Sequence, residues 1–380
     1  MAELLTNTTD LTKVASAIRE KGGTSDSLVY PDGFVTAIQA IQTGTELQII
    51  VSVTSGATVT ATKGSLSVSG TSVNGTCTLT VPEAGTWIVK ATLNGQTSGE
   101  ESVSVVDSYS LTLSFVSSTL NNNEWSVIKS VSDAGQGANY WSIGDRKAVT
   151  LNGTVGKLSL SNVTTYAFII GFNHNASVEG ANRIHFQLAK TALSGGTDVC
   201  FCDSQYSPDN GWSSAGAGYF VMNASNTNSG GWKSSQMRTN ICGTSLSSYS
   251  GTIIAVIPAA LRAVLKSVTK YTDNTGGRST AASAVTATTD YFFLLSEYEV
   301  FGSISRANSH EASKQAQYAY YSAGNSKIKY KHNGTSTAAH WWLRSPDASH
   351  PSLFVIVYTD GTANYSGAYY SLGFAPGFCV

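Results

Sequence analysis

Cys200 and Cys202 are separated by one residue, and a pair of thiols at this spacing could bind a metal ion. On a β-strand, residues i and i+2 point to the same face, so both sulfur atoms could reach one ion. A structural zinc site needs four ligands, however, and no second Cys/His pair lies at a usual spacing. Cys242 and His185 could complete the set only through a coincidence of the fold. We therefore predict no metal site and no cofactor.

The remaining residues with catalytic potential are scattered along the sequence. His174, His332 and His350 lie among Asn, Gly, Ser and Pro, which indicates loops, and His340 precedes Trp341. No HExxH motif, nucleophile elbow or paired-carboxylate pattern surrounds them. A Ser/His/Asp site could still assemble in space, but the sequence favours a protein that is not an enzyme. An odd number of cysteines, 5, excludes a complete disulfide framework and favours buried free thiols in a protein folded in a reducing cytosol.

Length and composition narrow the class of protein. A chain of 380 residues is expected to form two or three domains. Only 12% of residues are charged and the net charge is −1, so no pattern indicates a nucleic-acid partner. The start of the chain lacks the apolar core of a signal peptide. The longest apolar run, residues 253–265, is interrupted and too short to span a bilayer, so we expect no membrane insertion.

The periodicity of apolar residues predicts three segments. Residues 1–44 read as two short helices, the first capped by Asp10 and ended by Gly22-Gly23, the second opened by Pro31. Residues 45–107 alternate between polar and apolar side chains, with turn signals between short runs, which predicts an all-β sandwich of immunoglobulin type. Trp87 is expected in its core, and Asp107-Ser108 is the expected linker. The two helices are predicted to have apolar faces at Leu11, Val14, Ala15, Ile18, Phe34, Ile38 and Ile41.

Residues 108–380 combine strand patterns with helical ones, so we predict an α+β domain. Strands are expected at residues 111–115, 157–160, 167–170, 185–188 and 292–295. Pro258 is placed in the first turn of a predicted helix whose apolar face runs from Leu261 to Val268. Ser296 begins a capping box, which predicts the start of another short helix. A tyrosine-rich helix is expected over residues 309–322.

The C-terminal segment has a distinctive composition. From Asp347 to Val380 there is no Lys, Arg, Glu, Gln, Met or Trp, whereas Tyr, Ser, Gly and Asn are frequent. Binding loops use these residues because Tyr gives rigid contact area and small polar residues adapt. A charge-poor tail of strands could show the same bias by chance. The predicted variable ligand-binding face, within about 347–372, is Asp347, Ser349, His350, Ser352, Leu353, Val355, Ile356, Tyr358, Asn364, Tyr365, Ser366, Tyr369, Tyr370 and Leu372.

The residues that flank this segment are predicted to be scaffold. They are Trp341, Trp342, Leu343, Arg344, Gly373, Phe374 and Phe378. Trp341 and Trp342 could instead stack on a sugar or a base. We favour a core position because Leu343 follows directly and the planar guanidinium of Arg344 could hold nearby carbonyls or a carboxylate.

This pattern resembles the variable proteins of diversity-generating retroelements, whose C-terminal segment lies on a C-type-lectin-like fold. In that family, copying errors at adenines turn template Asn codons into many residues, but not into Lys, Glu, Gln, Met or Trp. The third segment also resembles a phage domain marked by a Trp-Trp-Leu-Arg-Ser-Pro motif and related to formylglycine-generating enzymes. Relatives often carry Arg near the last turn, where this chain has Ala375, and Cys379 alone does not supply the catalytic cysteine pair of those enzymes.

The N-terminal segments carry resemblances of their own. Residues 11–41 are similar to a module of phage tail and fibre proteins, which implies attachment or trimerisation, although a hairpin that merely caps the next domain would look the same. Residues 45–107 resemble immunoglobulin-like domains of phage and bacterial surface proteins, whose usual role is spacing or weak adhesion.

The sequence therefore predicts a phage tail-tip or tail-fibre receptor-binding protein, located in the virion. Its expected partners are a host bacterial surface receptor, either protein or glycan, phage tail components, and copies of itself in a homotrimer. The alternatives are a polysaccharide-degrading tail enzyme and a purely structural baseplate protein.

Overall fold

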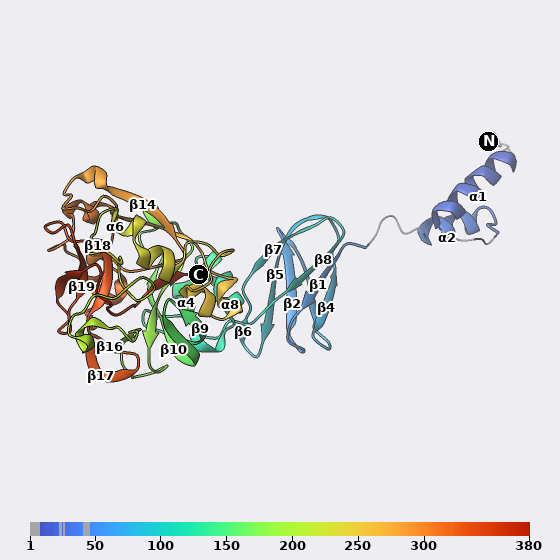
Figure 1. The fold of residues 1–380 in the computed structure, drawn as a ribbon. Helices are drawn as coiled ribbons and strands as arrows, with labels where there is room; N and C mark the ends of the chain where they lie inside the picture. The colour runs from blue at the N-terminus through green and yellow to red at the C-terminus, as the bar shows by residue number, and fades with distance from the viewer. Residues whose placement is uncertain (1–7, 23–24, 26, 41–45) are drawn as a thin grey trace. The chain divides into compact units, whose positions relative to one another are not determined.

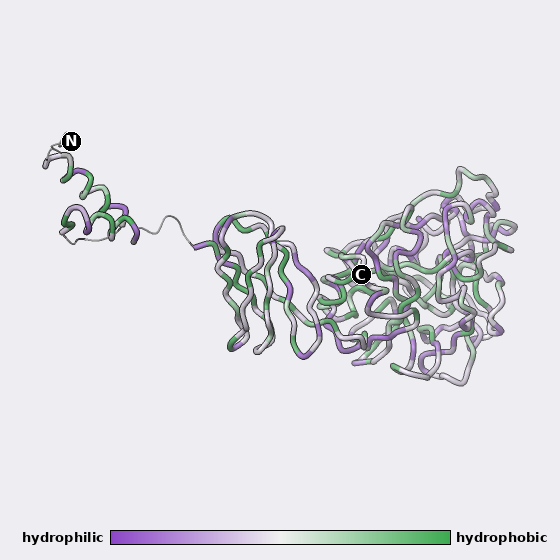
Figure 2. The backbone as a smooth tube through the Cα atoms, turned by 180° about the vertical axis from the view of Figure 1, so that it is seen from behind, coloured by the Kyte–Doolittle hydropathy of each residue, from purple (hydrophilic) through white to green (hydrophobic). Residues whose placement is uncertain are grey.

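The structure is a computed structural model that describes residues 8–22, 25, 27–40 and 46–380. The chain divides into two compact units, Met1–Phe115 and Val116–Val380 (Figure 1). Both are rich in β-strands, and Figure 2 shows hydrophobic stretches, in green, among the strands of each. Some of the predictions concern residues outside this described part, namely Gly23, Ile41 and residues 43–45. Within the described part of the chain, no helix combines the length and apolar character needed to cross a bilayer.

The first unit begins with two short helices, α1 (Thr8–Gly22) and α2 (Asp32–Ala40). They pack on each other through a small core of Ala15, Ile18 and Phe34. The start of α2 after Pro31 confirms the prediction. Asp10 lies inside α1 and does not precede it, so its predicted capping role is wrong. The predicted apolar faces are only partly covered, because two helices this short cannot enclose more than a few side chains.

The strands of the first unit form two sheets with a common hydrophobic core. One sheet has the order β4 (Thr76–Thr80), β1 (Gln48–Ser52), β8 (Ser108–Thr112). The other has the order β3 (Leu66–Thr71), β2 (Thr58–Lys63), β5 (Gly85–Leu93), β6 (Gln96–Thr97), with β7 (Glu101–Val105) also paired to β5. Ile49, Val51, Val59 and Trp87 are fully buried between them, which confirms the alternation and the core position of Trp87.

The predicted boundary after Asp107 is wrong. Strand β8 pairs in parallel with β1, with Ser108 opposite Gln48, so the expected linker lies inside a sheet of the first unit. The division between the units falls after Phe115. The error arose because the alternating strand at residues 111–115 was assigned to the following domain.

The largest sheet of the second unit has five strands. Its order is β15 (Phe292–Phe293), β21 (Gly377–Cys379), β11 (Ile184–Lys190), β10 (Leu158–Phe172), β9 (Arg146–Val155). The C-terminal strand β21 thus lies between β15 and β11 and pairs antiparallel with both. Phe378 is fully buried and stacks on Phe186 at 5.2 Å between ring centroids. The end of the chain is therefore part of the core.

Three smaller sheets complete the strands of this unit. Their orders are β12 (Val199–Cys200), β16 (Lys329–Lys331), β17 (Gly334–Ala339); β13 (Val268–Asp273), β14 (Val285–Asp290); and β18 (Trp341–Pro346), β19 (Leu353–Val357), β20 (Ala363–Gly367). Short helical segments connect them: η1 (Leu120–Asn122), α3 (Trp125–Asp133), α4 (Gly137–Tyr140), α5 (Ala176–Glu179), η2 (Ser207–Asn210), α6 (Gly231–Ser234), η3 (Met237–Cys242), α7 (Ile253–Val256) and η4 (Ala282–Ala284). The chain is mostly β, with several separate sheets and few long helices.

The helix predictions for this unit had mixed outcomes. The capping box is confirmed, because the Ser296 hydroxyl accepts from the Glu299 amide at the start of α9 (Glu297–Phe301). The helix expected after Pro258 is only α8 (Ala259–Arg262), and Val268 already begins β13. Apolar residues at helical spacing were misleading there, since a buried loop and a strand need apolar residues too.

The tyrosine-rich helix expected over residues 309–322 is also not continuous. It is divided into a 3₁₀ segment, η5 (Ser309–Lys314), and a single turn, α10 (Ala319–Ser322). Tyr318, between them, is fully buried with an extended backbone. Its hydroxyl contacts a buried charged group described below.

Candidate binding face

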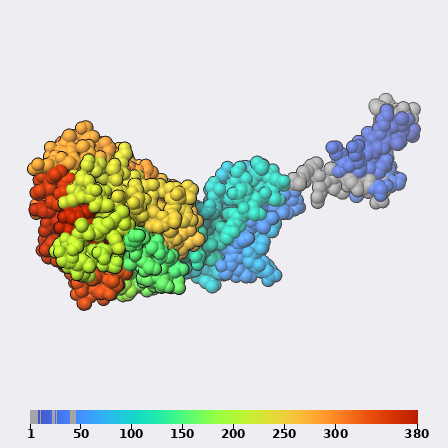
Figure 3. All heavy atoms as spheres, viewed as in Figure 1, coloured from blue at the N-terminus to red at the C-terminus, as the bar shows by residue number. Residues whose placement is uncertain are grey.

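The predicted variable segment, residues 347–372, forms two strands and three loops of the second unit. Strands β19 and β20 extend the sheet that begins with the Trp-Trp-Leu-Arg-Ser-Pro strand β18. Figure 3 shows part of this C-terminal region, coloured red, at the surface of the unit. Nine of the predicted face residues are exposed or partly exposed: Ser349, His350, Ser352, Leu353, Tyr358, Asn364, Tyr365, Tyr369 and Tyr370.

The other five predicted face residues are buried, and for these the prediction is wrong. Val355, Ile356 and Leu372 are at most 1% exposed. Neighbouring residues on a strand point to opposite faces. Because Val355 and Ile356 are both buried, β19 is covered on both faces and cannot offer either side chain to a ligand. Asp347 and Ser366, 2% and 6% exposed, are also inside the unit.

Asp347 holds the first loop of the segment in shape. Its Oδ1 accepts hydrogen bonds from the amides of Ser349 and His350 at 2.8 and 2.9 Å. From the other side, the buried Asn228 amide donates to the carbonyls of Asp347, His350 and Leu353 at 3.2, 2.8 and 2.8 Å. No local sequence pattern singles out Asn228, because its partners are more than a hundred residues away. The loop is therefore a fixed platform.

A cluster of rings, exposed or partly exposed except for the buried His340, forms what we call the aromatic face. It consists of Trp212, His340, Tyr358, Tyr369 and Tyr370. The ring centroids of Trp212 are 5.4 Å from His340 and 5.5 Å from Tyr370, and His340 is 4.3 Å from Tyr358. Tyr369 and Tyr370 stack at 4.5 Å. Three predicted tyrosines are thus brought together by the fold.

Tyr365, the fourth predicted tyrosine, belongs to a separate contact. Its ring lies 5.1 Å from the His350 ring, and the Arg306 guanidinium lies 4.8 Å above it. Arg306 was not predicted. A guanidinium over an aromatic ring gives a modest attraction and orients the ring.

The sequence analysis missed Trp212, which is the most exposed residue of the aromatic face. It is 41% exposed, and its φ of 60° lies in the left-handed region. A bulky residue rarely adopts this conformation, and such strained positions concentrate at functional sites. The available sequence signal was weak, because a tryptophan after glycine is equally compatible with a core position.

Hydrogen bonds fix the Trp212 loop to the end of the variable segment. The amide of Trp212 donates to the Ser207 carbonyl at 2.7 Å. Ser207 and Ser371 are joined by two hydrogen bonds, of 2.8 and 2.9 Å. The buried Asp203 carboxylate accepts from the Ser371 hydroxyl at 2.8 Å, and burial raises its pKa. Trp212 therefore has a fixed position relative to the predicted face.

The flanking residues predicted as scaffold are all buried. Trp341, Trp342, Leu343, Phe374 and Phe378 are fully buried, which confirms the core interpretation of the two tryptophans. Both indole N–H groups donate to backbone carbonyls, at 2.9 and 2.8 Å.

Gly373, also predicted as scaffold, has a role that depends on its lack of a side chain. A Cβ at this position would lie 2.3 Å from the Cys200 sulfur, which is closer than atoms can approach. The strand carrying Cys200 therefore packs directly on this backbone.

Arg344 belongs to a buried group of ionisable residues that we call the charged cluster. Its members are His174, Glu179, Lys270, Glu299, Tyr318 and Arg344. Arg344 pairs with both oxygens of Glu299, and its Nη2 lies 3.0 Å from Oε1. Lys270 Nζ lies 2.7 Å from Glu179, 2.8 Å from Glu299 and 2.8 Å from the Tyr318 hydroxyl. The cluster joins β13, α5, α9 and β18.

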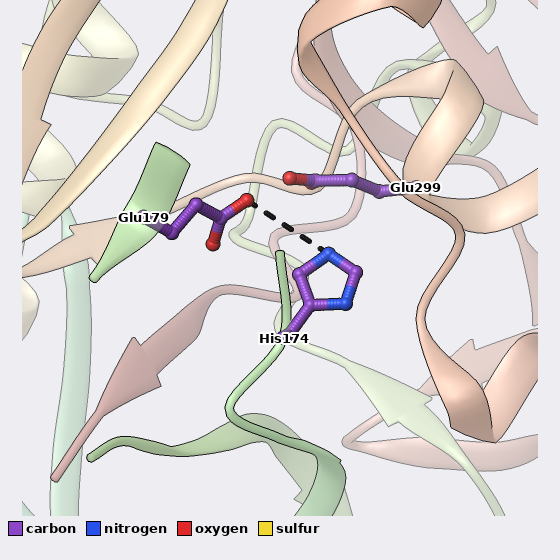
Figure 4. A group of neighbouring side chains, drawn as sticks. All are labelled: His174, Glu179 and Glu299. Carbon is purple, nitrogen blue, oxygen red and sulfur yellow. Dashed lines mark ion pairs between the residues drawn. The ribbon is translucent and has the colours of Figure 1, made fainter. Parts of the chain in front are cut away.

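Three members of this cluster have the residue types of a metal site. One ligand atom each from His174, Glu179 and Glu299 lies within 4.8 Å of the others (Figure 4). The Lys270 ammonium, however, already bonds both carboxylates. A divalent ion at this position would have to displace the ammonium from both carboxylates, and Arg344 would remain beside Glu299 as a further positive charge. We conclude that these residues form a structural ion-pair network.

Burial and the neighbouring charges shift the pKa values of the cluster residues in different directions. Burial would raise the pKa of Glu299, but the nearby Arg344 and Lys270 hold it well below its usual range. Burial raises the pKa of Glu179 to about 7. Burial and the Lys270 charge lower the pKa of His174 to about 3, so this histidine, interpreted as a loop residue, is a neutral buried ring. It stacks on Tyr318 at 3.7 Å.

The Cys200 and Cys202 pair is also buried. The sulfur atoms of Cys200 and Cys202 are 3.9 Å apart, as the shared strand face suggested. Burial and the neighbouring Cys200 raise the pKa of Cys202 well above its ordinary value, which disfavours the thiolate that a metal requires. No further Cys, His or carboxylate joins the two sulfurs in a ligand group within the described residues.

Comparison with known proteins gives limited information. Residues 218–380 match a family described as a domain of unknown function (DUF6273). The match covers less than half of the chain and includes the charged cluster residues Lys270, Glu299 and Arg344, strand β18 and the whole predicted variable segment. No curated protein matches the chain.

Proposed function

We propose that this protein is a receptor-binding protein of a phage tail tip or tail fibre, and that it binds through the aromatic face and the loop of residues 347–353. The observation that supports this most is the contrast within one short segment. Tyr358, Tyr369 and Tyr370 lie in loops at the surface, in the same ring cluster as Trp212, while the strand β19 from which the first of these loops extends is almost entirely buried. An exposed group of Tyr, Trp and His on a rigid base is typical of binding surfaces.

In this proposal the second unit has a C-type-lectin-like fold of the kind carried by variable proteins of diversity-generating retroelements. The exposed residues of segment 347–372 are the diversified ones. Val355, Ile356 and Leu372 are excluded as ligand contacts because they are buried. A reverse transcriptase gene close by, together with a near-copy of the codons for residues 347–372, would support this origin. Their absence would speak against it.

The strands of the first unit act as an immunoglobulin-like spacer in this proposal, and the N-terminal helices attach the protein to the tail or form a trimer. Val14, Val35 and Ile38 are 48%, 51% and 53% exposed on these helices. Apolar side chains this exposed favour a partner. Light scattering of the whole protein and of a shortened protein that begins at Gly44 tests the trimer. Monomers in both cases would contradict it.

A polysaccharide-degrading enzyme is less well supported. Such enzymes use two carboxylic acids in an accessible cleft. Glu179 and Glu299 are close together, but both are buried and bonded to Lys270. These two carboxylates therefore have no access to a substrate.

The central experiment measures binding of fluorescently labelled whole protein to a panel of bacterial strains. A variant with Tyr358, Tyr365, Tyr369 and Tyr370 replaced by Ser should lose binding to the strains that the natural protein labels. Tyr109→Ser is the matched control, since Tyr109 is 39% exposed in the first unit, and it should bind normally. Equal binding by the four-residue variant would refute the proposed face.

A further inference from the structure

Trp212 combines an exposed position with a strained backbone conformation. Its indole is 41% exposed although its backbone adopts the unfavourable left-handed conformation. The loop that carries it is bonded to Ser371, so the ring is held in place. An exposed ring that is held at a strained position is well suited to contact a partner.

The surroundings of the indole are aromatic rather than aliphatic. Three large hydrophobic side chains of the second unit's described residues are exposed, namely Leu193, Trp212 and Tyr358. Two of these belong to the aromatic face. The interface core of a protein partner combines aromatic and aliphatic side chains over roughly 800 Å² per partner. The aromatic face lacks an exposed aliphatic surround, so its chemistry favours a different ligand.

Polar groups border the rings. Asp209, three residues before Trp212, forms an ion pair with Lys331. Asp360 is near enough to influence the charge of His340. The His340 ring lies between Trp212 and Tyr358, and its Nδ1 is buried, without a hydrogen-bond partner among the described residues. Because Lys331 is already paired with a carboxylate, the surface offers no excess positive charge for a nucleic-acid backbone.

A pyranose ring matches these features. Its C–H bonds form an apolar face that packs on an indole, while its hydroxyl groups point outward to hydrogen-bonding side chains. We infer that Trp212, with Tyr370 beside it and Tyr358 on the other side of the His340 ring, forms a stacking subsite for one sugar ring of a bacterial surface polysaccharide. This inference rests on the proposed function, and it names a glycan as the receptor. Trp212 lies outside residues 347–372, so this anchor would stay constant while the neighbouring tyrosines vary.

The first test uses simple sugars and the whole protein. Saturation-transfer NMR is measured with methyl glycosides of glucose, galactose, N-acetylglucosamine and mannose. We expect at least one to receive saturation, and Trp212→Ala to reduce that signal about tenfold, whereas Trp212→Phe retains most of it. Leu193→Ala is the control, because Leu193 is 45% exposed on the same unit. A signal that is absent, or unchanged in Trp212→Ala, overturns the subsite.

The second test separates this inference from the proposed function. A strain that the natural protein labels is treated either with periodate, which destroys sugar diols, or with a protease. Loss of binding after periodate alone supports a glycan receptor. Loss after protease alone, with binding by Trp212→Ala intact, overturns the glycan while receptor binding stands. If no strain is labelled but a sugar signal depends on Trp212, the receptor function fails and the sugar subsite remains.

Discussion

The charged cluster and the aromatic face both gather residues that could do chemistry, but their partners differ. In the cluster, Lys270 donates to two carboxylates and a tyrosine hydroxyl. The Arg344 guanidinium donates to the Glu299 carboxylate and to nearby backbone carbonyls. On the aromatic face, Trp212 and Tyr358 leave about two fifths of their side chains uncovered. The comparison shows that residue type alone does not identify a site. What matters is whether the fold has already supplied the partners.

This comparison predicts that damage to the cluster affects stability strongly. Arg344→Met removes the main counter-charge of Glu299 and leaves a buried carboxylate with less compensation. Breaking a buried pair on one side costs about 3–5 kcal/mol, which we expect as the loss in free energy of unfolding measured in urea.

Lys331→Met is the matched control for Arg344→Met. It breaks the more exposed pair with Asp209 and should cost at most about 1 kcal/mol. Equal costs for the two variants would show that the cluster is not the structural centre we describe.

A second prediction concerns stability and contrasts buried with exposed residues of the segment 347–372. Ile356 is 1% exposed, so Ile356→Ala should lower the free energy of unfolding by about 2–5 kcal/mol through lost burial and the cavity left behind. Chemical denaturation measures this. A cost below about 1 kcal/mol would indicate that β19 is covered less completely than described and could take part in binding after all.

The capping box at Ser296 and the buried strand β19 show what could be predicted from the sequence. The capping box at Ser296 was predictable because its hydrogen bonds join residues three apart. The burial of β19 also had a signal, since residues 353–357 are continuously apolar and such a run is typical of a strand covered on both faces. The compositional bias of the segment led us to place Leu353, Val355 and Ile356 on the binding face.

The charged cluster and Trp212 lacked any such local signal. Lys270, Glu299 and Arg344 come from strands and helices far apart in the chain, and only the fold brings them together. Trp212 becomes informative through its exposure and its φ angle, neither of which composition reveals. Local patterns thus predicted elements and core, while the partners of polar groups required the structure.

A third prediction concerns acid. The folded state holds His174 neutral with a pKa of about 3, whereas the unfolded chain protonates it below the ordinary value of 6.5. The unfolded state therefore binds more protons between these values, and this histidine's contribution to stability falls as the pH drops from 6.5 toward 3. His174→Phe keeps the ring stacked on Tyr318 and removes this titration. Relative to the natural protein, it should gain roughly 2 kcal/mol between pH 7 and pH 5.

Urea unfolding across this pH range is the measurement for His174→Phe. Tyr109→Phe, at an exposed position of the first unit, is the control for an aromatic substitution, and it should retain the acid slope of the natural protein. Parallel curves for His174→Phe and the natural protein would mean that His174 is not held neutral by the cluster. Buried His185, whose pKa is also lowered well below its ordinary value by burial, contributes with the same sign and should preserve part of the slope in both variants.

The smallest expected effect on stability belongs to the aromatic face. Tyr358 is 37% exposed, and its ring contacts only the neighbouring His340 ring among the aromatic groups of the face. Tyr358→Ser should change the free energy of unfolding by no more than about 0.5 kcal/mol, as is usual for surface positions. Binding to labelled strains should nevertheless fall at least about tenfold, because a single tyrosine of a binding surface can carry this much of the affinity. Paired measurements of melting and of cell binding test this prediction. Ile356→Ala, two residues earlier, serves as the comparison, because it should lower stability strongly. A much lower melting temperature would show that Tyr358 is a core residue. Normal binding would show that Tyr358 is not part of the proposed site.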